Sequence, residues 1–133
     1  MAYVLGVVVA LLVGAFARVA GFDRDRSFYP TVLIITATYY VLFAAIGQSN
    51  EALIVETIVM VLFVAVAVAG FRLKPWMIAA GFAAHAVFDL VHGGMIDNPG
   101  VPPWWPAFCL AIDVALAGLL VLLPSRSVRA LNE

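Results

Sequence analysis

Residues 74–97 read KPWMIAAGFAAHAVFDLVHGGMID and combine a long apolar run with three ionisable side chains near its centre. His85, Asp89 and His92 are spaced i, i+4 and i+7. At about 100° per residue, an α-helix places these three side chains on one face, within an arc of roughly 60°. Ionisable groups are costly in hydrocarbon, so an apolar helix that carries several of them indicates a functional site.

The composition of the whole chain is typical of a membrane protein. Of 133 residues, 65% are hydrophobic and 11% are charged, whereas a soluble domain is about 45–50% apolar and about 25% charged. The net charge of −1 provides no basic surface for nucleic acid. The single cysteine, Cys109, allows no internal disulfide. We therefore expect a lipid bilayer around the protein and no nucleic-acid partner.

Five apolar stretches each approach the roughly 20 residues that a helix needs to cross about 30 Å of hydrocarbon. In lipid, every backbone polar group needs an internal partner, which favours helices over open strands. The sequence therefore predicts an all-α fold, an integral membrane bundle of five transmembrane helices forming a single domain over residues 1–133. The expected helices cover residues 2–20, 31–47, 52–71, 75–94 and 105–123.

The distribution of basic residues predicts how the bundle is oriented. With five spans, the connecting loops alternate between the two sides of the membrane. All seven basic residues fall on one side, namely Arg18, Arg24, Arg26, Arg72, Lys74, Arg126 and Arg129. The positive-inside rule then puts the N-terminus outside, the C-terminus in the cytoplasm and the protein in the cytoplasmic membrane. No basic segment precedes the first span, so we interpret it as retained and not as a cleaved signal peptide.

Small residues predict close helix packing. Gly6, Ala10 and Gly14 form a ridge at four-residue spacing on the first helix. Such ridges let two helix backbones approach closely in lipid. The ridge could serve packing inside the chain or a contact with another subunit. A homo-oligomer and a partner membrane subunit therefore both remain open.

Polar residues on four helices are expected at similar depths. At about 1.5 Å per residue, Asp89 lies about 7–8 Å and His85 about 13 Å below the outer end of the fourth helix. The same arithmetic puts Asp113 of the fifth helix about 12 Å deep, Glu56 of the third about 6 Å and Tyr40 of the second about 10 Å. We therefore expect one cluster in the outer half of the membrane.

Histidine and carboxylate side chains together suit a divalent transition metal, zinc first among them. The expected ligands are His85, Asp89, His92 and Asp113. Cys109, one turn before Asp113, is an outside candidate. Glu56 and Tyr40 would support the ligands or act as a general acid/base pair. Metal-assisted hydrolysis, in which the ion activates water, is the most economical mechanism if the protein is an enzyme.

Two other interpretations stay open at this point. Membrane transporters use chains of acidic and histidine side chains, so the cluster could serve a metal or proton transporter. It could also be a structural polar core that fixes helix register, for example in an accessory subunit. The sequence decides neither the reaction nor whether the protein is an enzyme.

Residues 85–113 read HAVFDLVHGGMIDNPGVPPWWPAFCLAID and contain a spaced pattern of polar and aromatic residues. It consists of H-x3-D-x2-H from residue 85, a short loop, and W-P-x2-C-x3-D from residue 105. This pattern resembles a family of small bacterial multi-pass membrane proteins of unknown function. The resemblance covers the C-terminal third of the chain; it implies a helical membrane bundle with a polar site and implies no particular activity.

Overall fold

The computed structural model describes residues 1–129, and within that range every regular element is a helix. The long helices are α1 (Ala2–Ala20), α2 (Phe28–Ile46), α3 (Asn50–Arg72), α4 (Trp76–Met95) and α5 (Trp105–Leu122). Two short elements, η1 (Phe22–Arg24) and α6 (Arg126–Arg129), complete the described chain. All five long helices are long and apolar enough to cross a membrane, which confirms the expected fold class. Residues 130–133 of the expected domain lie outside the described residues.

Two helices begin earlier than the sequence predicts, and each has a local cause. Helix α2 starts at Phe28, three residues before the expected start, so Pro30 lies inside its first turn. A proline is accepted there because the first backbone N–H groups of a helix have no intrahelical partner. Helix α3 starts at Asn50 because Ser49 caps it, with the Ser49 hydroxyl oxygen accepting from the Ala52 N–H at 3.2 Å.

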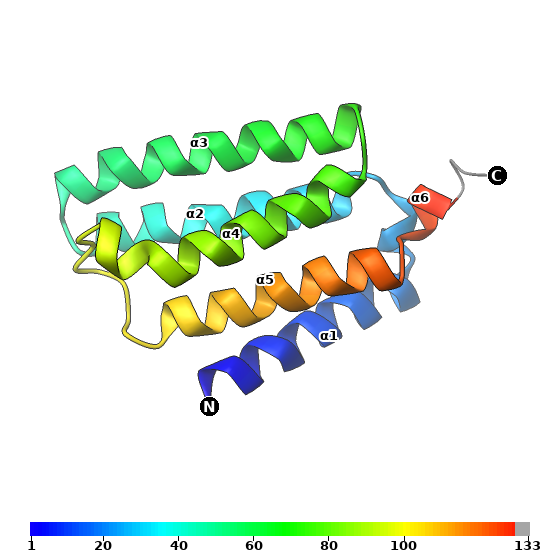
Figure 1. Cartoon of the computed structure of the whole chain (residues 1–133), viewed down its shortest axis with the longest axis horizontal. Helices are drawn as coiled ribbons and strands as arrows, with labels where there is room; N and C mark the ends of the chain where they lie inside the picture. The colour runs from blue at the N-terminus through cyan, green and yellow to red at the C-terminus, as the bar shows by residue number, and fades with distance from the viewer. Residues whose placement is uncertain (130–133) are drawn as a thin grey trace.

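Successive long helices run in opposite directions along the long axis of the molecule (Figure 1). Helix α5 packs against α1 and α4, while α2 and α3 form the other extensive pair. Helix α4 joins the two groups, because it contacts α5, α3 and α2. It therefore lies between the two groups, where its polar face can meet three neighbours.

The two ends of the bundle differ in charge. We call one end the basic end, because all the basic residues of the chain lie in the helix ends and connections there, at the right of Figure 1. There, Arg126 Nε lies 3.6 Å from Asp23 Oδ2, which ties α6 to η1. The opposite end, which we call the loop end, carries the turn at residues 47–49 and the loop at residues 96–104.

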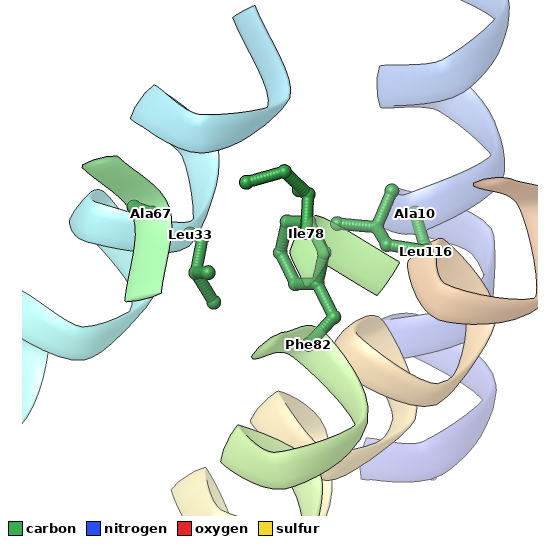
Figure 2. Close-up of a cluster of buried hydrophobic side chains, with 6 residues drawn as sticks. All are labelled: Ala10, Leu33, Ala67, Ile78, Phe82 and Leu116. Carbon is green, nitrogen blue, oxygen red and sulfur yellow. The ribbon is translucent and has the colours of Figure 1, made fainter. Parts of the chain in front are cut away.

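An apolar cluster fills the bundle on the basic-end side of the polar residues (Figure 2). Its six buried side chains come from all five long helices, and they are Ala10, Leu33, Ala67, Ile78, Phe82 and Leu116. Phe82 precedes His85 by one turn on α4, and Leu116 follows Asp113 by one turn on α5. Apolar side chains therefore close the bundle between the polar residues and the basic end. The polar residues lie in the half nearer the loop end.

The glycine ridge of α1 packs inside the chain. A Cβ atom on Gly6 would overlap the carbonyl oxygen of Phe108 and lie 2.7 Å from the Ala111 Cβ on α5. Ala10 and Ala17 are also fully buried on this face of α1. The backbones of α1 and α5 can approach closely only because Gly6 has no side chain.

Gly6→Ala should therefore loosen the contact between α1 and α5. Because a backbone carbonyl cannot move aside as a side chain can, we expect the free energy of unfolding to fall by about 1–3 kcal/mol. Thermal unfolding in detergent, followed by circular dichroism, measures the change. The matched control is Gly118→Ala on α5, where an added Cβ meets no atom within 4 Å. Equal melting temperatures for Gly6→Ala and the wild type would contradict this account of the packing.

Candidate metal centre

Two histidine–carboxylate pairs lie buried between α3, α4 and α5. His85 Nδ1 is 2.6 Å from Asp113 Oδ2 and 3.6 Å from Asp89 Oδ2. His92 Nε2 is 2.7 Å from Glu56 Oε1. None of these five residues is more than 2% exposed. Helix α4 supplies both histidines and so connects α5 at the first pair with α3 at the second.

Tyr40 of α2 links the two pairs. Its hydroxyl donates a hydrogen bond to Asp89 Oδ1 at 2.7 Å. Its ring stacks on the His92 imidazole, with centroids 4.1 Å apart and planes 23° from parallel. The polar side chains of four helices therefore form one continuous buried network.

Four side chains of this network form the group that could hold a metal ion: His85, Asp89, Cys109 and Asp113. Each offers one donor atom, and these atoms all lie within 4.8 Å of one another. The geometry follows from helical spacing, because each helix contributes two residues at i, i+4, which share a face. Since α4 and α5 pack extensively, the two faces meet.

Several buried polar atoms around this group have no hydrogen-bond partner among the described residues. They are His85 Nε2, Asp89 Oδ2, Asp113 Oδ1 and, in the second pair, Glu56 Oε2. Buried side-chain polar atoms usually have a hydrogen-bond partner, so each exception needs a physical explanation. Three of the four belong to the possible metal-binding group. Three of the four residues of the group therefore carry a buried polar atom that no described residue satisfies.

The structure divides the sequence-predicted site residues between two places. It brings His85, Asp89 and Asp113 together, with Cys109 in the fourth position of the group. It places His92 against Glu56 instead. His85 and His92 are separated by seven residues, or about 10.5 Å along the helix axis, so they meet different neighbours.

Asn98 is a member of the network that the sequence did not reveal. Its side-chain amide donates to Glu56 Oε1 at 2.9 Å and to the Tyr40 carbonyl oxygen at 3.0 Å. Its carbonyl oxygen accepts from the Gly100 N–H at 3.2 Å. A Cβ on Gly100 would overlap the Phe43 carbonyl oxygen, so the loop lies directly on the end of α2. In the sequence, the one indication of this role was a polar side chain beside Pro99 and Gly100. Asparagine is common in such turns without any contact to a buried network.

A cavity of about 380 Å³ opens at the loop end, close to the second pair. Ala52 and Val55, which line it, lie on the turn of α3 that precedes Glu56. Glu51 and Asp97 give its rim a negative charge. The cavity is therefore suited to attract cations towards the end of the bundle where the network begins.

The fold and the site together define a class of protein: a bundle of five candidate membrane helices with a buried group that could hold a metal ion. Comparisons of the chain with protein-family models, with curated proteins and with solved structures gave no match. The resemblance of residues 85–113 to small bacterial multi-pass membrane proteins therefore stays a prediction. A function for the chain has to be inferred from the geometry of its own residues.

Asn98→Ala should release the loop from the network. Loss of the two donated bonds leaves a buried carboxylate and a backbone carbonyl short of a partner, which should lower the free energy of unfolding by about 1–3 kcal/mol. The Gly100 amide should also exchange faster with solvent deuterium. Asp97→Ala is the matched control, because the neighbouring Asp97 side chain is exposed. If both variants unfold alike and exchange alike at Gly100, the loop is not held by Asn98.

Proposed function

We propose that the protein is a membrane-embedded metalloprotein that binds one divalent transition-metal ion through His85, Asp89, Cys109 and Asp113. One observation carries the proposal: four buried donor atoms converge within 4.8 Å, and three atoms of these residues lack a hydrogen-bond partner among the described residues. An ion at the centre of the group would supply those partners.

Charge supports a cation over a purely structural polar core. Asp89 and Asp113 face a single histidine, and all three side chains are shielded from solvent. Even with His85 protonated, two ionised carboxylates would leave a net negative charge in a medium of low polarity. Each uncompensated buried ion costs several kcal/mol, and direct ligation of a divalent cation by both carboxylates would offset that cost. The structural interpretation explains the close His85–Asp113 pair but leaves this charge unexplained.

The donor set supports zinc as the first candidate. Zinc binds imidazole nitrogen, thiolate sulfur and carboxylate oxygen, and four ligands satisfy its tetrahedral preference. Tyr40 supports this assignment, because its hydroxyl occupies Asp89 Oδ1 and leaves Oδ2 for an ion. Hydrogen bonds of this kind orient ligands and raise metal affinity.

The proposed orientation follows from the two ends of the bundle. Because the basic residues lie at one end, the positive-inside rule assigns that end to the cytoplasm. The N-terminus and the loop end would then face outward from a cytoplasmic membrane. The metal group would lie in the outer half of the bilayer, with the acidic cavity above it.

Hydrolysis is the reaction that such a site supports best. A zinc ion held by these four side chains would take a water molecule as a fifth ligand, lower the pKa of that water and stabilise negative charge on a substrate oxygen. Glu56 and His92, which Tyr40 connects to Asp89, would exchange protons with the substrate. Substrate would approach from the loop end, where the cavity lies.

Transport across the membrane fits less well. A transported ion or proton needs polar groups all the way to the basic end. In the described part of the chain, the apolar cluster of Figure 2 fills the bundle directly beneath His85 and Asp113. A resident ion that stays in the site is consistent with this closed floor.

Metal analysis of purified protein tests the ligand set. We expect about one zinc per chain in the wild type and loss of the metal in His85→Gln and Asp113→Asn, because each removes a ligand. His92→Gln is the matched control: glutamine keeps a donor for Glu56, and the proposal predicts that zinc is retained. The wild type should also lose its bound zinc at lower pH, because the ligands must be deprotonated to bind the ion.

Cobalt(II) loading separates the outcomes further. Cobalt bound to a thiolate absorbs in the near ultraviolet, so the wild type should show this band and Cys109→Ser should lack it. Absence of metal from the folded wild type under every loading condition would overturn the proposal and leave the structural interpretation. Metal loss in His92→Gln but not in Cys109→Ser would instead favour the ligand set expected from the sequence.

A further inference from the structure

A second cavity, separate from the metal group, lies along the surface of the bundle at the basic end. It measures about 790 Å³ and runs between the first turns of α4 and the last turns of α5. Its lining includes Trp76, Ala80 and Ala83 on α4 and Gly118 and Val121 on α5. We call it the α4–α5 groove. Ala80 and Ala83 are exposed while Phe82 and His85 are buried, so the groove lies on the outward face of α4.

The groove exists because small residues line it where helices usually carry bulky ones. A Cβ on Gly118 would meet no atom within 4 Å, so its position is open space. From Trp76 to Ala83 the groove follows α4 for about 10 Å, at about 1.5 Å per residue. Its volume falls within the roughly 300–1,000 Å³ typical of ligand pockets. An apolar, elongated space of this size on a membrane-facing surface suits an acyl chain.

Charge at the end of the groove indicates which lipid fits. Lys74 and Arg126 are the chain neighbours of the lining residues Pro75 and Ser125. Lys74 is exposed, and Arg126 is shared with Asp23 at 3.6 Å. Among the described residues that line the groove, none is acidic. Basic pockets beside membrane helices favour anionic headgroups over zwitterionic ones.

We propose that the α4–α5 groove binds one anionic phospholipid, with an acyl chain against Ala80, Ala83 and Gly118 and the headgroup against Lys74 and Arg126. Trp76, which is 65% exposed, lies at the headgroup level, where tryptophan side chains are enriched in membrane proteins. The lipid site is independent of the metal group, because it uses the outward face of α4 and none of the metal-binding residues.

Lipid retention provides the test. The full chain is reconstituted in bilayer discs of equimolar phosphatidylcholine and phosphatidylglycerol, and lipids that stay bound after transfer to mild detergent are counted by native mass spectrometry. We expect one phosphatidylglycerol per wild-type chain. Gly118→Leu should abolish this adduct, because the leucine side chain fills the groove. Lys74→Gln should lower the preference for phosphatidylglycerol about fivefold, the effect of one basic residue near a headgroup.

Gly94→Leu is the matched control. Gly94 also has no atom within 4 Å of an added Cβ, but it lies at the other end of α4 and does not line the groove. This variant should keep the lipid. Equal lipid counts in the wild type and Gly118→Leu would overturn the proposal, as would equal retention of the two lipids by the wild type. A dimer that Gly118→Leu dissociates would also overturn it, since a second copy would then occupy the groove.

Discussion

The rest of the structure depends on the cost of holding carboxylates inside a membrane bundle. Asp89, Asp113 and Glu56 are almost fully buried, and each finds its closest polar partner on another helix. Left unpaired, each would cost several kcal/mol. Tyr40, His85 and His92 offset that cost only if α2, α3, α4 and α5 adopt one rotation and one axial register. The polar network therefore specifies how four apolar helices, which could otherwise slide past one another, are aligned.

This constraint also explains the outward face of α4. Because His85, Asp89 and His92 must point inward, the alanines at positions 80, 83 and 84 point outward. Because these outward side chains are small, α4 leaves the space beside α5 that forms the α4–α5 groove. The buried site and the surface groove are thus two consequences of the same helical rotation, although they serve different ligands in our proposals.

The sequence predicts the five helices well because hydropathy and length depend on local residues alone. It predicts a common depth for the polar groups for the same reason, since depth follows from the rise per residue. Rotation about each helix axis depends on tertiary packing, and here the sequence is less informative. His92 and Cys109 show the difference: both have suitable spacing from neighbouring candidates, but only packing decides that α5 faces His85 while α3 faces His92. Asn98 was missed because a loop residue has no periodic pattern to indicate which way it points.

The arrangement of apolar and polar halves restricts how an ion would reach the proposed site. The cluster around Phe82 and Leu116 excludes approach from the basic end. At the loop end, Asn98 ties the loop to Glu56, which in turn holds His92. Along α4, the second pair lies between the acidic cavity and Asp89, and Glu56 Oε2 has no hydrogen-bond partner among the described residues. The second pair, which does not belong to the metal group, lies between the acidic cavity and that group along α4, so Glu56 and Asn98 would control access as well as proton exchange.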